Sequence, residues 1–201
     1  MRLGVDFDNT LVCYDQVFHA AARELDLIPP DLPVSKDSVR DYLRRAGRED
    51  DWTELQGFVY GPRMADAWPF TGALEFLKRC TMAGVPVWIV SHKTLHPYRG
   101  PQYDLHEAAR GWLAAHGVHD PAGIALPEEQ VYFELTKQEK LARIAALGCT
   151  HFIDDLPEFL AEPAFPDGVV RLLFDPNDHH PAETRFVRFG SWDDAWQVLG
   201  L

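Results

Sequence analysis

The sequence has few cysteines, no long hydrophobic run and a shortage of positive charge. Its three cysteines, Cys13, Cys80 and Cys149, form no Cys-x-x-Cys pair, so the sequence supports neither a disulfide framework nor a zinc site. No apolar run approaches the roughly 20 residues that a membrane-spanning helix requires, and the N-terminus lacks the basic and apolar regions of a signal peptide. We therefore expect a cytoplasmic protein without a membrane partner.

The balance of charge is acidic, because 31 Asp and Glu residues outnumber 19 Lys and Arg residues and give a formal net charge of -12. This excess disfavours nucleic acid as the main partner, since its backbone is also negatively charged. Hydrophobic residues make up 46% of the 201 residues, enough for one α/β core with a small accessory part.

Short apolar runs alternate with helical patterns along most of the chain. This alternation predicts an α/β fold, a doubly wound (Rossmann-like) parallel sheet with helices on both faces. The expected helices cover residues 72–83, 105–116 and 138–147. The expected strands cover residues 3–7, 85–90, 131–133, 151–153, 169–174 and 185–189.

Residues 15–68 interrupt this alternation, because they contain no convincing strand. Helical patterns occupy residues 17–25, 35–46 and 51–59, with a Pro-rich turn after the first of them. We predict a core made of residues 1–14 and 69–201, and a small helical cap inserted after the first strand. The alternative is that the insertion forms one more helical layer of the core.

An acidic pair follows the first expected strand. Asp6 and Asp8 alternate with Phe7, so they project to the same side, at the edge where open α/β sheets bind ligands. Two carboxylates this close favour a hard cation such as Mg²⁺. A calcium loop does not fit, because its sixth position would be Leu11 instead of glycine. A structural turn with two exposed aspartates is the alternative.

Further motifs follow the later strands in a fixed order, and with the acidic pair they resemble the haloacid dehalogenase-like superfamily. The resemblance covers residues 1–12 and 69–174. A looser similarity, in residues 69–72 and the helix after them, is to the deoxyribonucleotidase-type members. The motifs are Asp6-Phe7-Asp8-Asn9-Thr10, Ser91, Lys137 or Lys140, and Asp154-Asp155.

The resemblance implies a catalytic role for each motif. Asp6 is the expected nucleophile, and Asp8 is the expected acid for the leaving group and base for water. Thr10 is expected to orient these carboxylates, and Ser91 to bind a phosphoryl oxygen. A lysine neutralises the transferred group.

That lysine is Lys140 or Lys137. Thr136 and Glu139 have the spacing of a capping box, so a helix begins there and both lysines lie on nearly the same face of it. We prefer Lys140, because an apolar helical run starts with it.

The resemblance also implies a metal site and contacts to substrate. Asp154 and Asp155 would complete a Mg²⁺ site with Asp6 and Asp8. His92 and Lys93 follow Ser91 directly, and are candidates for contacts to substrate.

Arg63, in the insertion, is a third candidate for a contact to substrate, although it could instead pair with Asp66 on the surface. Two other features are assigned to structure. The segment 178–180, Asp-His-His, is expected to be a polar loop, and Trp192 and Trp196 are expected to pack in the core.

The implied function is magnesium-dependent hydrolysis of a small phosphorylated metabolite, a sugar phosphate or a nucleotide, through an aspartyl-phosphate. A phosphomutase shares the acidic pair and stays open. An alternative of a different class is a catalytically idle member that binds or regulates, although the complete set of motifs argues against decay of the site.

Overall fold

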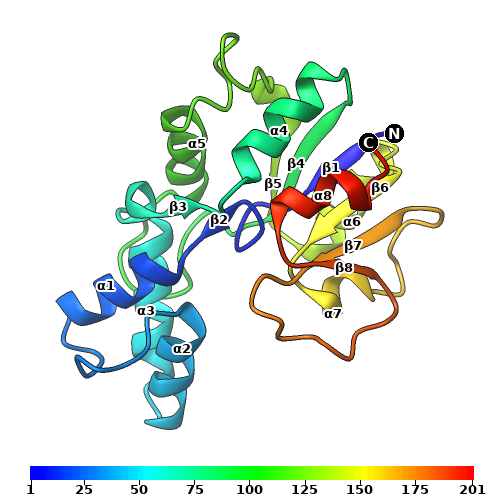
Figure 1. The fold of residues 1–201 in the computed structure, drawn as a ribbon. Coiled ribbons are helices and arrows are strands. Elements are labelled where there is room, and N and C mark those ends of the chain that lie inside the picture. The colour runs from blue at the N-terminus through cyan, green and yellow to red at the C-terminus, as the bar shows by residue number, and fades with distance from the viewer. The chain divides into compact units, whose positions relative to one another are not determined.

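The computed structural model describes all 201 residues, which form two compact units (Figure 1). The first unit contains Met1–Val12, Pro69–His92 and Gly117–Leu201, and the second contains Cys13–Trp68 and Lys93–His116. The chain therefore crosses between the units several times. None of the helices combines the length and the apolar character that crossing a membrane requires.

The first unit is built on a six-stranded parallel sheet with the order β5-β4-β1-β6-β7-β8. All six expected strands are confirmed, and so is the doubly wound parallel sheet. Its strands are β1 (Leu3–Val5), β4 (Val87–His92), β5 (Val131–Glu134), β6 (His151–Asp154), β7 (Val170–Phe174) and β8 (Val187–Phe189).

Helices cover both faces of this sheet because side chains alternate along its buried strands. Trp88, Val90 and Phe152 pack on one face in a cluster with side chains from α6 and α7. On the other face, the Trp192 ring lies 5.0 Å from that of Phe76 and 5.3 Å from that of Phe174. The helices are α4 (Ala73–Met82), α6 (Lys137–Ala146), α7 (Pro157–Leu160) and α8 (Trp192–Val198), with the 3-10 turn η2 (Glu128–Gln130) before β5.

The second unit is helical and contains more of the chain than the expected insertion. Its helices are α1 (Asp15–Glu24), α2 (Lys36–Arg45), α3 (Glu49–Tyr60), the 3-10 turn η1 (Met64–Asp66) and α5 (Leu105–Ala115). The sequence analysis assigned α5 to the core, whereas the structure groups it with the insertion. Two short strands at the crossings, β2 (Val12–Cys13) and β3 (Trp68–Pro69), form a separate two-stranded sheet.

Two glycines explain why residues 93–116 join the insertion. A Cβ added at Gly57 would lie 2.8 Å from Pro97, and one added at Gly61 would lie 2.8 Å from Tyr103. The Trp112 indole of α5 also donates a hydrogen bond of 2.8 Å to the carbonyl oxygen of Ala67. Residues 93–116 thus pack directly against the backbone of the two glycines, one in the last turn of α3 and one just after it.

Gly4 supplies a test of packing at the centre of the sheet. It lies opposite Phe152 in the β1–β6 ladder, and an added Cβ would lie 2.4 Å from Cδ2 of that ring. We expect Gly4→Ala to lower the free energy of unfolding by about 1–3 kcal/mol, the usual cost of overpacking. Urea denaturation followed by circular dichroism measures the change.

Gly111→Ala is the matched control, because nothing lies within 4 Å of its added Cβ in α5. Replacing a helical glycine there should raise stability by about 0.5–1 kcal/mol. Equal effects of the two substitutions would contradict the packing around Gly4.

Candidate active site

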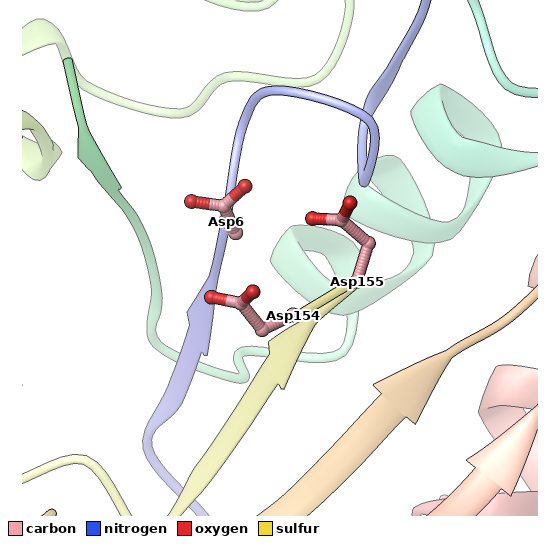
Figure 2. Close-up of side chains that lie close together, drawn as sticks. All are labelled: Asp6, Asp154 and Asp155. Atoms are coloured by element: carbon pink, nitrogen blue, oxygen red, sulfur yellow. The ribbon is translucent and has the colours of Figure 1, made fainter. Parts of the chain in front are cut away.

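Three acidic side chains meet where β1 and β6 end (Figure 2). Asp6 follows β1, and its backbone N–H donates a 2.9 Å hydrogen bond to the carbonyl oxygen of Ile153. Asp154 is the last residue of β6, and Asp155 comes directly after it. Because parallel strands end at one edge, this pairing brings residues 148 positions apart in sequence to the same place.

A buried lysine joins two of these carboxylates. The Lys140 ammonium donates 2.6 Å hydrogen bonds to Oδ1 of Asp6 and to Oδ2 of Asp154, and only 3% of the lysine is exposed. Burial alone would lower the pKa of Lys140, but the charges of Asp154 and Asp6 outweigh it and raise that pKa above its usual value. Burial raises the pKa of Asp154, and Lys140 opposes that shift.

The two candidate lysines of α6 therefore occupy different places. Lys137 is the first residue of the helix and is half-buried, and it makes none of these contacts. Lys140 lies one turn later with its Nζ 4.1 Å from the centre of the Phe159 ring. The structure places Lys140 in the acidic cluster, in line with the preference drawn from the sequence.

Two hydroxyl groups complete the contacts of Asp6. Ser91 Oγ donates a 2.8 Å hydrogen bond to Asp6 Oδ1, the same oxygen that Lys140 contacts. Thr10 Oγ1 lies 3.5 Å from Asp6 Oδ2 and 3.3 Å from Asp155 Oδ1. A hydroxyl has one proton to donate, so Thr10 serves only one of these carboxylates at a time.

A tight turn after Asp6 carries Asp8 and Thr10. Asn9 has a positive φ of 58°, which asparagine tolerates better than most residues, and the N–H groups of Leu11 and Val12 both donate to the carbonyl oxygen of Phe7. The Trp192 indole donates a 3.1 Å hydrogen bond to the Thr10 carbonyl oxygen. Sequence reasoning missed this role of Trp192, because nothing in the pattern of a packed tryptophan reveals a bond to a distant backbone atom.

Comparisons with solved structures identify the fold, whereas no family model matches the sequence and no curated protein does. A HAD family hydrolase from Deinococcus radiodurans R1, solved with bound phosphate and sodium, is 18% identical with a TM-score of 0.59, over 99% of this chain and 94% of its own. A predicted phosphoglycolate phosphatase from Haemophilus somnus is 13% identical with a TM-score of 0.58, over 98% and 97%. Protein tyrosine kinase A from Mycobacterium tuberculosis is 16% identical with a TM-score of 0.63, over 100% and 98%.

The chain has the haloacid dehalogenase-like fold. In this fold the expected motifs lie at the ends of three neighbouring strands and on the helix that follows β5. At such low identities the shared fold does not assign chemistry, so the roles of the residues are argued from their own contacts.

The donor set of the cluster suits a hard divalent cation. Oxygens of Asp6, Asp154 and Asp155 all lie within 4.8 Å of one another. Three carboxylates beside one ammonium leave an excess of negative charge, which a cation that prefers oxygen ligands would offset. The Asp8 side chain, which the sequence analysis added to the metal site, does not belong to this group.

The candidates for substrate contact lie in different surroundings. The His92 ring, at the end of β4, is 3.2 Å from the Leu135 carbonyl oxygen, and burial lowers its pKa, which favours the neutral ring. Lys93 is buried in the second unit against the ring of Tyr60. Arg63 pairs with Glu24 and, at 2.5 Å, with Asp66, which is the surface ion pair that the sequence left open.

The segment of Asp178, His179 and His180 is a loop, as expected, and the structure shows what shapes it. The Asp175 carboxylate accepts hydrogen bonds of 2.8 Å and 2.9 Å from the backbone N–H groups of His179 and His180. These bonds use the backbone of the loop and leave its histidines outside the acidic cluster.

Lys140 and Lys137 form a matched pair for a stability test. Lys140→Met leaves two buried carboxylates without their cation, so we expect a loss of about 3–5 kcal/mol in the presence of a chelator, and partial recovery when Mg²⁺ is added. Lys137→Met should change the free energy of unfolding by less than about 0.5 kcal/mol. Urea unfolding at neutral pH measures both, and similar small losses would contradict the arrangement around Lys140.

Proposed function

We propose that the protein hydrolyses small phosphate monoesters in a magnesium-dependent reaction, with Asp6 as the nucleophile. The observation that carries the proposal is the fixed carboxylate of Asp6, whose Oδ1 accepts hydrogen bonds from both Ser91 and Lys140. The Deinococcus radiodurans structure with bound phosphate and the Haemophilus somnus protein named as a phosphatase add support, since they share the fold.

The contacts of Asp6 distinguish its two oxygens. Oδ1 is engaged by Ser91 and Lys140, whereas Oδ2 has only the long 3.5 Å contact to Thr10. Oδ2 is therefore the oxygen available to attack phosphorus. In this step the bond from Oδ2 to phosphorus forms as the ester oxygen leaves, which gives an aspartyl-phosphate and an alcohol.

Asp8 is proposed to supply and then remove a proton. It is half-buried on the turn after Asp6, so it can exchange protons with bulk water. Asp8 protonates the leaving oxygen, and then takes a proton from the water that attacks phosphorus and regenerates the Asp6 carboxylate. The products are the free alcohol and inorganic phosphate.

Lys140 and its partner Asp154 are proposed to balance charge during transfer. The ammonium next to Asp6 offsets negative charge on the transferred phosphoryl group. The buried position of the ammonium strengthens this electrostatic attraction. Asp154 holds the lysine through Oδ2, and its Oδ1 accepts a 2.9 Å bond from the Leu156 N–H. Asp6, Asp154 and Asp155 would hold a divalent ion, which when bound would polarise the phosphoryl oxygens.

Asp6→Asn tests the nucleophile. The amide cannot accept a phosphoryl group, so we expect phosphate release to fall at least about 10⁴-fold while the thermal unfolding profile shows a folded protein. Asp26→Asn is the control, because Asp26 is exposed and its positive φ suits asparagine equally well. The assay screens sugar phosphates and nucleotides for inorganic phosphate.

Full activity in a folded Asp6→Asn protein would sink the assignment. Transfer of the phosphoryl group to a second metabolite, without inorganic phosphate, would instead indicate a mutase.

Removal of metal gives a second test. We expect a chelator to abolish phosphate release, Mg²⁺ to restore it and Ca²⁺ to inhibit it, because Ca²⁺ takes more oxygen ligands and can engage both oxygens of Asp6. Asp155→Asn should raise the Mg²⁺ concentration needed for half-maximal activity about 10- to 100-fold, as loss of a ligand or its partner usually does. Rates that survive exhaustive chelation would reject the metal site.

A further inference from the structure

The first residue of α8, Trp192, connects the last helix of the chain to the turn that follows Asp6. Its indole N–H donates a 3.1 Å hydrogen bond to the Thr10 carbonyl oxygen. Only 2% of Trp192 and none of Thr10 is exposed, so bulk water does not reach this bond. A carbonyl oxygen buried without a donor is costly, and the indole therefore stabilises this one conformation of the turn.

Three phenylalanine rings hold the indole in place. Their ring centres lie 5.0 Å, 5.3 Å and 5.8 Å from that of the indole, for Phe76 of α4, Phe174 of β7 and Phe189 of β8. These spacings are those of favourable aromatic pairs. The start of α8 is also closely packed, because a Cβ added at Gly72 would lie 3.1 Å from the Trp192 Cβ. The indole N–H thus has a defined position relative to the sheet.

Neighbouring peptide groups of the turn are held by other bonds. The Leu11 N–H donates a 3.0 Å hydrogen bond to the Phe7 carbonyl oxygen, and the Leu11 carbonyl oxygen accepts one of 2.9 Å from the Phe70 N–H. The Thr10 carbonyl oxygen lies between these two bonds along the chain, and Trp192 binds it. Loss of the indole N–H would therefore release the peptide group next to the Thr10 side chain.

The Thr10 side chain places a hydroxyl between two carboxylates of the acidic cluster. Its Oγ1 lies 3.5 Å from Asp6 Oδ2 and 3.3 Å from Asp155 Oδ1. Both distances are longer than those of ordinary hydroxyl hydrogen bonds, so a small rotation of Thr10 breaks the contacts. Asp6 Oδ2 is the oxygen proposed to attack phosphorus, and the bonds from Ser91 and Lys140 go to Oδ1 instead. The orientation of Thr10 therefore decides how well Oδ2 is held.

We propose that Trp192 is a positioning residue for the acidic cluster. Its indole N–H fixes the Thr10 peptide group, and the Thr10 hydroxyl in turn orients Asp6 Oδ2 and Asp155. For turnover the inference rests on the proposed hydrolysis, whereas for binding of Mg²⁺ it rests on the cluster alone. Such a residue affects kcat more than KM, because a small displacement of a reacting group slows the reaction of substrate that is already bound.

Removal of the indole N–H tests the proposal. In Trp192→Phe we expect kcat for phosphate release to fall about 10- to 100-fold, as displacement of a reacting group does, with KM nearly unchanged. The Mg²⁺ dissociation constant, measured by calorimetric titration without substrate, should rise about tenfold because Asp155 loses its oriented partner. Benzothienylalanine in place of Trp192 keeps the size of the ring and replaces its N–H by sulfur, so it should give the same losses without a change in packing.

Two other tryptophans supply controls. The ring centre of Trp196, in the same helix, lies 6.5 Å from that of Phe76 and 4.2 Å from the Arg79 guanidinium, so Trp196→Phe tests the packing of α8. Trp112 is also 2% exposed and its indole donates to the Ala67 carbonyl oxygen, so Trp112→Phe tests the loss of a similar bond elsewhere. Both controls should leave kcat and the Mg²⁺ dissociation constant unchanged. Losses in either control equal to those of Trp192→Phe would overturn the proposal.

A double-mutant cycle separates positioning from packing. Thr10→Val keeps the shape of the side chain and removes its hydroxyl. If Trp192 acts through this hydroxyl, Trp192→Phe should change kcat and the Mg²⁺ dissociation constant less than about twofold in the Thr10→Val protein. Losses that multiply in the double variant would mean that Trp192 contributes packing alone, and the positioning role would be wrong.

Binding of Mg²⁺ keeps this result independent of turnover. If the four proteins of the cycle show the non-additive change in Mg²⁺ affinity while no ester releases phosphate, the positioning role stands and the proposed hydrolysis fails. If phosphate is released but the losses in kcat and in Mg²⁺ affinity multiply, the hydrolysis stands and the positioning role fails.

Discussion

The candidate site depends on one buried ion-pair triad, in which Lys140 lies between Asp6 and Asp154. Each of these charged groups alone would be costly to bury. The three together are tolerable because the ammonium pairs with both carboxylates, which also accept hydrogen bonds from Ser91 and from the Leu156 N–H. The triad joins β1, β6 and α6, so the groups proposed for chemistry also tie these three elements together. A cation added to the cluster would find carboxylates already gathered and oriented.

The fold could be predicted from the sequence because its buried strands are apolar runs bounded by turns and its helices carry clear stripes of apolar side chains. Thr136 illustrates this at one residue: its side chain accepts a bond from the Glu139 N–H, as the spacing predicts. Helices and strands too short to contain a full repeat of the hydrophobic pattern were not predicted. Helix α7 has four residues and strands β2 and β3 have two each, too few for any periodicity to show.

Less of the candidate site than of the fold could be predicted from the sequence. The order of motifs located Asp6, Ser91, Lys140 and Asp154, because strand ends meet at one edge of a parallel sheet. The contacts that a side chain makes across the fold could not be predicted. The hydrogen bond from Trp192 to the Thr10 carbonyl oxygen and the contact of the Lys36 ammonium with the Tyr60 ring both join residues far apart in sequence. The roles in turnover of all these residues, and of Asp8, His92 and Lys93, stay predictions.

The contact of Pro97 with Gly57, and of Tyr103 with Gly61, has a consequence for how this protein can be dissected or can evolve. Because the second unit is made from two separated stretches of chain, no single excision removes it. Deleting residues 15–68 alone would remove α3 and η1, against which α5 packs, together with the Ala67 carbonyl oxygen that accepts the Trp112 hydrogen bond. Apolar side chains of α5 exposed in this way would favour aggregation. Exchange of this unit between relatives therefore requires that both stretches of chain be replaced together. Substitutions at Gly57 and Gly61 are limited because the other stretch packs against them.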